Sequence, residues 1–491
     1  MPFNDLQSQI IALAASSASL EPTPAERSTW QVAADKLVGD FIDRLPTLKM
    51  FSPLQPMTLA DFDREVAQNL SPELLLAAVK NGLTQVGILT GGAGHLGFIP
   101  GGGLYLGAVA DHFAAAINAF TADAFSSPIA VHIHNQAIRW LANLIGYNES
   151  SWGDITSGGS QATLTALCVA RDACGIKPRD YAITCVYLGE HTHHCCRKSL
   201  DILFAGDIQV REVPSINHVM DHARLANQIA IDIENGLKPW LIVATGGSTN
   251  LGLVDPISEI GSVAQKHKMW LHVDGAYGGF FKLCPETSAL FSGLAEADSV
   301  VLDPHKGMFL PYGCGAVLFK DGTHLGRAFA ATGSYLQDRN GEPNMLRSPM
   351  DYSMELTRPF RSLRLWLFIK VYGENILTNA LSEKLLLARY ACKQISAIEN
   401  IVITSPLDLS IFAFHFEPPT GDSRDRNVCT KELLRRINSH SEVFLTSTLI
   451  DDLFVIRVAV LSFRTHIETI DSLIDIVSQE SRLLAQNLES L

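Results

Sequence analysis

Short apolar runs alternate with stretches of helical spacing through the middle of the chain. Five of these runs have the length and composition of buried strands: residues 182–187, 240–244, 269–273, 299–302 and 315–319. The segment 111–147 before them, and the segments between them, repeat their apolar residues with helical spacing. Strands that alternate with helices are typical of an α/β domain built on a largely parallel sheet.

The two ends of the chain show other patterns. Helical spacing covers 4–17 and 26–44, and a proline-containing stretch follows. Near the other end, a helix is predicted over 361–372, where Gly373 stops it. Beyond that helix the pattern predicts more strands and helices, at 401–404, 410–416, 430–438, 453–460 and 466–485. We therefore predict three parts: a helical N-terminal segment (1–85), a large domain (86–372) and a small C-terminal α/β domain (373–491).

One segment is long and uncharged enough to suggest a membrane span. Val86–Ala110 has 25 residues without a formal charge, and about 20 apolar residues suffice to cross a bilayer. It also contains nine glycines and Pro100, and such a backbone does not hold a helix in lipid without support. We expect a glycine-rich loop close to a ligand and no contact with a membrane.

Composition narrows the class of protein. Charged residues make up 18% of the 491 residues, against about 25% in ordinary globular proteins. The net charge of −13 repels nucleic acid and anionic lipid, so we expect neither as a partner. Nine cysteines without a C-x-x-C pair do not form a disulfide framework, and the first 20 residues lack the basic start of a signal peptide. These features predict a cytoplasmic protein with reduced thiols.

Unusual residues follow four of the apolar runs. Thr245 begins a Thr-Gly-Gly-Ser sequence after one run, and Asp274 ends another, before Gly-Ala-Tyr-Gly-Gly. A third run leads into Asp-Pro-His-Lys, which contains His305 and Lys306, and a fourth into the His/Cys cluster 191–196. Ligands of α/β proteins gather at the carboxyl ends of the strands. These residues are therefore candidates for one site.

A lysine and an aspartate at strand ends, together with a glycine-rich helix start, are what pyridoxal phosphate requires. The lysine amine forms a Schiff base with the cofactor, and the carboxylate keeps the pyridine nitrogen protonated. The sequence Thr-Ser-Gly-Gly-Ser, which includes Gly159 and Ser160, precedes an apolar helix. The amide groups and dipole of such a helix start can hold a phosphate.

Each feature alone also has an ordinary explanation. The Gly-Gly-Ser sequence can be a plain helix cap, and Asp274 can cap a turn. The His/Cys cluster suggests zinc, but structural zinc sites combine spaced pairs from two segments, and the chain has no second such pair. We predict no metal site.

In combination, the motifs Asp-Gly-Ala-Tyr-Gly-Gly and Pro-His-Lys resemble those of the group II pyridoxal-phosphate-dependent amino acid decarboxylases. The resemblance is collinear from about His95 to Arg464. It implies the fold-type I, aspartate aminotransferase-like architecture, with a mainly parallel seven-stranded sheet. It also implies a site residue by residue: Lys306 as the Schiff-base lysine, Asp274 at the pyridine nitrogen, Ala276 and His193 on the two ring faces, Gly159, Ser160 and His305 at the phosphate, and Thr245 near the ring oxygen.

The resemblance further implies the reaction, in which an L-amino acid loses CO2 through Schiff base and quinonoid intermediates and leaves as an amine. Tyr335, 29 residues after Lys306, resembles the family's loop tyrosine that protonates the product carbon, although it can also be an ordinary loop aromatic. Two departures, Gly307 in place of a large residue and Cys195 in place of serine, leave the substrate open. Alternatives are an aldehyde synthase or another carbon–carbon lyase on the same cofactor, or a non-catalytic or metal-binding protein.

The resemblance implies a homodimer whose N-terminal helices pack on the partner subunit. Burial between subunits would explain the low charge content, because surface that is charged in a monomer becomes interface. We expect the substrate to be a small molecule, an amino acid with an aromatic, aliphatic or anionic side chain.

Overall fold

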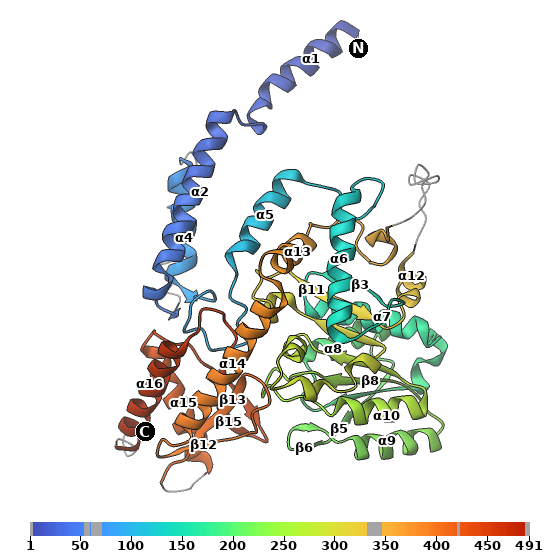
Figure 1. Ribbon diagram of the computed structural model, residues 1–491, viewed down its shortest axis with the longest axis vertical. Coiled ribbons are helices and arrows are strands. Elements are labelled where there is room, and N and C mark those ends of the chain that lie inside the picture. Colours follow the sequence, from blue (N-terminus) through green and yellow to red (C-terminus); the bar gives the residue numbers. More distant parts are fainter. Residues whose placement is uncertain (1–2, 54–58, 60–70, 331–345, 420–422, 487–491) are drawn as a thin grey trace. The chain divides into compact units, whose positions relative to one another are not determined.

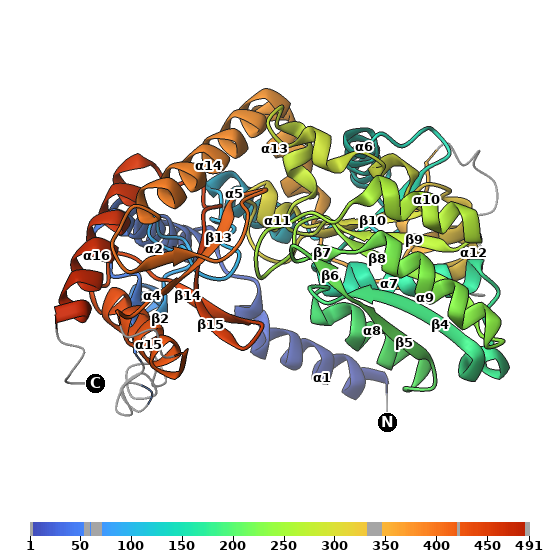
Figure 2. The same cartoon turned by 90° about the horizontal axis from the view of Figure 1, so that it is seen from below.

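The computed structural model describes residues 3–53, 59, 71–330, 346–419 and 423–486. The chain divides into two compact units, Met1–Gly92 and Ala93–Leu491. The boundaries after residues 85 and 372, which separate the three predicted parts, remain predictions. Figures 1 and 2 show the elements from two directions.

The first unit is mainly helical. Its elements are α1 (Phe3–Ser16), α2 (Pro24–Arg44), α4 (Pro72–Gln85) and the paired strands β1 (Phe51–Ser52) and β2 (Gly87–Ile88). The sequence starts α2 with a capping box, in which Thr23 accepts a bond from the Glu26 amide and Glu26 accepts one from the Thr23 amide. Pro24 follows at the first helical position, where its missing N–H costs nothing.

The second unit contains a seven-stranded sheet in the order β3-β11-β10-β9-β8-β4-β5. Its strands are β3 (Trp152–Thr156), β4 (Thr184–Gly189), β5 (Gln209–Val213), β8 (Lys238–Thr245), β9 (Trp270–Asp274), β10 (Ser299–Leu302) and β11 (Gly315–Phe319). All neighbours pair in parallel except β11, which is antiparallel to both β10 and β3. The mainly parallel seven-stranded sheet is thus confirmed.

Helices cover both faces of this sheet (Figure 1). Helices α7 (Gly159–Ala173) and α8 (His194–Phe204) pack together on one face, and α9 (His222–Glu234) and α10 (Ile257–His267) pack together on the other, the arrangement that right-handed crossovers give for this strand order. The remaining elements of this region are α5 (Tyr105–Ile117), α6 (Pro128–Ile145), α11 (Pro304–Gly307), α12 (Thr323–Phe329), α13 (Ser362–Val371) and the hairpin β6 (Ser215–Ile216) and β7 (Val219–Met220).

A four-stranded antiparallel sheet lies beside the larger one (Figure 2). It consists of β12 (Ile401–Ile403), β13 (Ile411–Phe416), β15 (Leu453–Ala459) and β14 (Thr446–Ile450), with α14 (Gly373–Ile395), α15 (Ser423–Ser439) and α16 (Ile467–Gln486). The helix α14 belongs to two cores. Leu377, Leu381 and Leu385 join the core of the large sheet, whereas Ala391 and Ile395 join that of the small one.

In the two larger sheets, the described residues include three strands that the pattern did not predict, β3, β5 and β14, and the two-residue strands β1, β2, β6 and β7 were not predicted either. The sequence of β3 contains a glycine and Asp154, which is unusual for a buried strand. Asp154 is buried because Arg358 donates a hydrogen bond to it at 2.7 Å. Strand β5 is the half-exposed edge of the sheet, so its sequence is largely polar.

The predicted helical segment 111–147 is two helices. Helix α5 begins at Tyr105, inside the stretch expected to be a loop, and ends at Ile117, where Asn118 caps it with a left-handed φ of 48°. Helix α6 then starts at Pro128. None of the described helices combines the length and apolar character that crossing a bilayer requires.

Candidate active site

The candidate site lies where the carboxyl ends of five parallel strands meet. Strand β8 ends at Thr245 and β9 at Asp274, and these two residues are direct neighbours in the sheet. Asp303 follows β10, Gly158 follows β3, and His193 follows β4. Because these strands are parallel, residues as far apart in sequence as Gly158 and Lys306 lie around one cavity.

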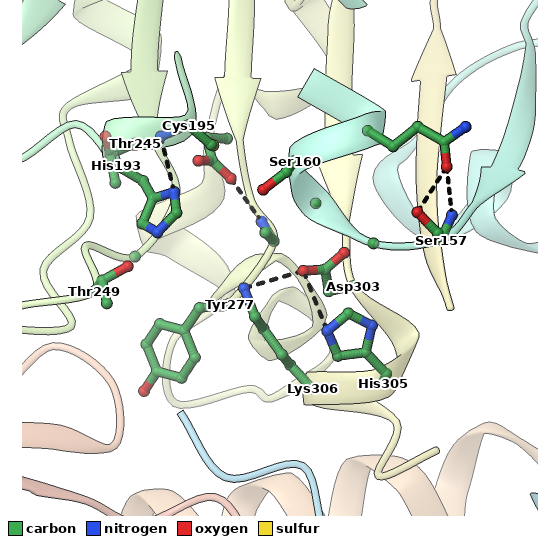
Figure 3. A pocket seen from close by; sticks show the side chains of 16 residues that line it. Ser157, Ser160, His193, Cys195, Thr245, Thr249, Tyr277, Asp303, His305 and Lys306 are labelled. Carbon is green, nitrogen blue, oxygen red and sulfur yellow. Dashed lines mark hydrogen bonds and ion pairs between the residues drawn. The ribbon is translucent and has the colours of Figure 1, made fainter. Parts of the chain in front are cut away.

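The cavity has a volume of about 330 Å³, within the range of small-molecule pockets. All eight residues predicted to contact the cofactor line it: Gly159, Ser160, His193, Thr245, Asp274, Ala276, His305 and Lys306. Figure 3 shows the amine of Lys306 pointing into the cavity, with His193 and Thr245 opposite. Tyr335, the predicted acid, lies outside the described residues.

Lys306 is held by a carboxylate. Its Nζ lies 3.0 Å from Oδ2 of Asp303, whose side chain is only 2% exposed. Burial lowers the pKa of Lys306, but Asp303 and Asp274 outweigh it, and the pKa lies above its ordinary value. The amine is therefore an ammonium ion at neutral pH, and it becomes a nucleophile only after losing a proton.

His305 contacts the same carboxylate from the other side. Its Nε2 lies 3.6 Å from Oδ2 of Asp303, and its Nδ1 lies 2.8 Å from the carbonyl oxygen of Cys314. Burial lowers the pKa of His305, so the neutral ring carries its proton on Nδ1 and donates it to that carbonyl. The other ring nitrogen, Nε2, therefore has no proton and can accept a hydrogen bond.

Asp274 and Thr245 present polar atoms to the cavity from adjacent strands. One carboxylate oxygen of Asp274 accepts the backbone N–H of Ala276 at 3.1 Å, which orients the side chain at the strand end. The Thr245 hydroxyl is buried and has no hydrogen-bond partner among the described residues. A buried hydroxyl without a partner is costly, so this atom fits a site that a ligand completes.

The start of α7 forms a close-packed cradle. A side chain at Gly159 would bring its Cβ within 2.8 Å of Oδ2 of Asp303 and 3.4 Å of the Ala276 methyl. Only glycine lets the helix start approach the ends of β9 and β10 this closely. The first amides of a helix have no carbonyl partner within it, and they suit a phosphate.

His193 and Cys195 form the opposite wall. The backbone N–H of Cys195 donates to Nδ1 of His193 at 3.3 Å, so His193 also caps α8. Hydrogen bonding to Cys195 raises the pKa of His193. Hydrogen bonds from Cys196 and His193 lower the pKa of Cys195 to about 5, although burial opposes this. Of the two adjacent thiols, Cys195 is therefore the one whose pKa is lowered, whereas hydrogen bonding to Cys195 and burial raise the pKa of Cys196.

Several residues of the cavity escaped the sequence analysis. Asp303 could have been predicted as a site residue from the sequence, because it directly follows a buried strand and stands three residues before Lys306. Tyr277 belongs to the Asp-Gly-Ala-Tyr-Gly-Gly motif but was given no role, because its partner is distant in sequence: its hydroxyl lies 2.8 Å from that of Ser410, 133 residues later. The other unassigned lining residues are Ser157, Gly158, Gln161, Cys195, Gly247 and Thr249.

These residues fit pyridoxal phosphate. A half-buried lysine, a carboxylate at a neighbouring strand end, a hydroxyl without a partner among the described residues and a glycine-lined helix start surround one cavity of suitable size. All nine cysteines lie in the described part of the chain, and all are free thiols.

Comparisons with known proteins agree with this fit. Residues 86–417 match the pyridoxal-dependent decarboxylase conserved domain. The aromatic-L-amino-acid decarboxylase of Bacillus atrophaeus is 32% identical over 379 residues, covering 76% of this chain and 78% of the relative. The phenylacetaldehyde synthase of Arabidopsis thaliana is 26% identical over 370 residues, covering 73% and 76%.

Among solved structures, Oryza sativa TDC with pyridoxal phosphate and tryptamine superimposes with a TM-score of 0.88 at 22% identity. The superposition covers 95% of this chain and 99% of that one. The expected fold-type I architecture is thereby confirmed.

Proposed function

Because the chain belongs to the pyridoxal-dependent decarboxylase family, we propose that it removes the carboxyl group of an aromatic L-amino acid and releases the amine and CO2. One observation carries the proposal: the Lys306 amine, paired with Asp303, shares a cavity with Asp274 and the start of α7. The aromatic substrate class is supported by the relative that is 32% identical over three quarters of the chain.

The family's cofactor, pyridoxal phosphate, supplies an electron-accepting ring that stabilises the carbanion left when CO2 departs. Within the proposal, Lys306 holds the aldehyde carbon, and Asp274 holds a proton on the pyridine nitrogen. The amides at the start of α7 and Ser160 bind the phosphate, and so does His305 once its Nε2 has taken up a proton. His193 and Ala276 enclose the ring, and Thr245 donates a hydrogen bond to its oxygen.

Asp303 positions the lysine in this scheme. At 3.0 Å from Nζ, it keeps the amine at the centre of the cavity and stores the proton that the amine must lose. The carboxylate is buried and also faces Nε2 of His305. A proton displaced from Lys306 therefore has a neighbouring acceptor within the site.

The test is CO2 release from a panel of twenty amino acids plus dopa, diaminobutyrate and cysteine sulfinate. We expect release from tryptophan, tyrosine, phenylalanine or dopa, and equimolar amine. The Lys306→Ala variant should lose the visible absorbance of the bound cofactor and all turnover. A wild-type protein that stays colourless after its metal has been removed and pyridoxal phosphate has been added would contradict the proposal.

Tyr335 is proposed to deliver the proton that completes the amine. We expect Tyr335→Phe to suppress amine formation by about 10²–10⁴-fold, the usual contribution of a general acid, while the spectrum of the bound cofactor stays the same. Amine and cofactor absorbance are measured in parallel. Unchanged amine turnover would refute the role.

Aldehyde formation is the second candidate, because a phenylacetaldehyde synthase covers a similar share of the chain at 26% identity. An assay for peroxide and aldehyde separates the two reactions. Amine without peroxide supports the decarboxylase. The same assay applied to Tyr335→Phe tests whether the amount of aldehyde formed increases as the amount of amine decreases.

We also propose a homodimer in the cytoplasm. Along α5, four side chains spaced four residues apart form an exposed apolar stripe: Tyr105, Val109, Phe113 and Ile117. The buried residues of this helix, Gly107 and Ala110, lie away from the stripe. Apolar stripes of this kind commonly mark protein interfaces.

A further inference from the structure

Three metal-ligating side chains converge inside the cavity. The structure places His193, Cys195 and Asp274 with one ligand atom each, a ring nitrogen, Sγ and a carboxylate oxygen, all within 4.8 Å of one another. The first two stand at the start of α8, and the third ends β9. The three residues come from two segments about 80 residues apart. The His/Cys cluster had no second ligand segment in the sequence, and in the fold Asp274 provides one.

This set of donors suits zinc. Imidazole, thiolate and carboxylate are its usual ligands, at bond lengths of about 2.0–2.3 Å. In a tetrahedral site such donors lie about 3.3–3.6 Å apart, so the three side chains need to close by roughly 1–1.5 Å at most from the spacing of 4.8 Å. Side-chain rotation provides a movement of this size without moving the strand or the helix.

The cavity gives water access to the fourth ligand position, which the three side chains leave open. Three protein ligands leave one position open, which water fills in zinc sites of this type. All three residues line the cavity of about 330 Å³, so water and an incoming ion reach them through the same opening that the cofactor uses. Cys195 itself is only 5% exposed, so a site here is shielded from bulk solvent.

We propose that the cofactor-free protein binds one Zn²⁺ ion between His193, Cys195 and Asp274, and that this ion and the cofactor exclude each other. The exclusion rests on the proposed function, because His193 and Asp274 are the residues assigned there to the cofactor ring. Neither side chain can bind both ligands at once. The ion is an inhibitor of loading, so the working enzyme contains no metal.

Cobalt provides the direct test, because Co²⁺ replaces Zn²⁺ and absorbs visibly when bound to a thiolate. The cofactor-free protein is titrated with Co²⁺ alongside the Cys195→Ser and Cys196→Ser variants. Cys196 is the matched control: it is the next residue of α8, it is fully buried, and it is not one of the three donors. We expect one equivalent of Co²⁺ with thiolate absorption in the wild type and in Cys196→Ser, and its loss in Cys195→Ser.

Two further measurements complete the test. X-ray absorption of the Zn²⁺-loaded wild type should find one sulfur ligand at about 2.3 Å among lighter ligands, and this experiment needs no variant. With Zn²⁺ at ten times its dissociation constant, the apparent affinity for pyridoxal phosphate should fall about elevenfold. The same competition should be absent in Cys195→Ser.

Thiolate absorption that survives in Cys195→Ser, or a zinc site without sulfur, would overturn the metal site. Equal Co²⁺ binding with and without saturating pyridoxal phosphate would overturn the exclusion. If the protein takes up no pyridoxal phosphate at all, the proposed function fails, while the titration of the cofactor-free protein still decides the metal site.

Discussion

Asp303 determines the charge state of the reactive lysine. The carboxylate is buried, lies 3.0 Å from Nζ of Lys306 and faces His305 at 3.6 Å. Its second oxygen, Oδ1, has no hydrogen-bond partner among the described residues. A buried carboxylate with one unpaired oxygen costs stability. Such a residue is typical of a functional site, where the cost is offset by the lysine that it holds.

We predict that Asp303→Asn moves the pH dependence of cofactor attachment to lower pH. Asp303 raises the pKa of Lys306, whereas burial lowers it. Removing the anion therefore lowers the pKa and increases the fraction of neutral amine at pH 7. The rate at which visible absorbance develops after pyridoxal phosphate is added to the cofactor-free protein, measured across pH, gives the midpoint.

Asp298→Asn is the control for this experiment. Asp298 is the corresponding carboxylate just before β10, at the end of the strand away from the cavity, where it accepts the Leu271 amide at 2.8 Å. Its replacement should leave the midpoint unchanged. A midpoint that does not move in Asp303→Asn would remove Asp303 from the positioning role.

At the scale of elements, α7 is the clearest case of a helix whose place depends on one glycine. The helix starts directly behind β3 and packs against β3, β9, β10 and β11. A methyl group at Gly159 would collide with Asp303 at 2.8 Å. We predict that Gly159→Ala weakens binding of pyridoxal phosphate by at least tenfold, measured by spectroscopic titration.

Gly175→Ala is unsuitable as its control, because Gly175 has a φ of 64°. Gly261 on α10 is better: a Cβ there meets only a Leu271 methyl at 3.6 Å, an ordinary contact. Gly261→Ala should bind the cofactor as the wild type does. Equal affinity in Gly159→Ala would show that the helix start does not depend on close approach.

The exposed apolar stripe on helix α5 is the proposed dimer contact. Phe113 is 57% exposed in the middle of the apolar stripe. If the stripe is a dimer contact, Phe113→Asp buries an unpaired charge there and should weaken association by about 2–4 kcal/mol, or roughly 30- to 1,000-fold. Light scattering after gel filtration measures the mass.

Ala115→Asp is the matched variant. Ala115 is exposed on the same helix, but two residues from Phe113, which is about 200° around the helix axis. It should remain a dimer. Dissociation of both variants, or of neither, would contradict the assignment of the stripe.

At the scale of the whole molecule, one cavity and one helix connect the two larger hydrophobic cores of the second unit. Tyr277, at the rim of the cavity, shares a hydrogen bond with Ser410 beside the small sheet. Helix α14 contributes Leu377, Leu381 and Leu385 to the large core and Leu387, Ala388, Ala391 and Ile395 to the small one. A ligand in the cavity should therefore stabilise both cores together.

We predict that pyridoxal phosphate raises the thermal midpoint of the whole transition. At one hundred times its dissociation constant, a ligand stabilises the folded state by about 2.7 kcal/mol. Calorimetry of the loaded and cofactor-free protein should show the entire second unit shifting. A shift confined to part of the transition would mean that the two cores unfold independently.

The sequence by itself determined most of the large sheet and the chemistry of the site. Apolar runs marked five of its seven strands, because burial on both faces requires continuous apolar sequence. The same runs located Thr245, Asp274, His305 and Lys306 at strand ends. Strand β3 was missed because its Asp154 is neutralised by Arg358, a partner 204 residues away that no local pattern contains.

Only the tertiary structure decided which of these groups meet. The convergence of His193 and Cys195 on Asp274 depends on the order of strands in the sheet, whereas the ion pair of Lys306 with Asp303 forms within a single turn after β10. Strand order results from the packing of helices on both faces, and it is not encoded in any short segment. The residue types were therefore readable from the sequence, whereas their contacts came from the fold.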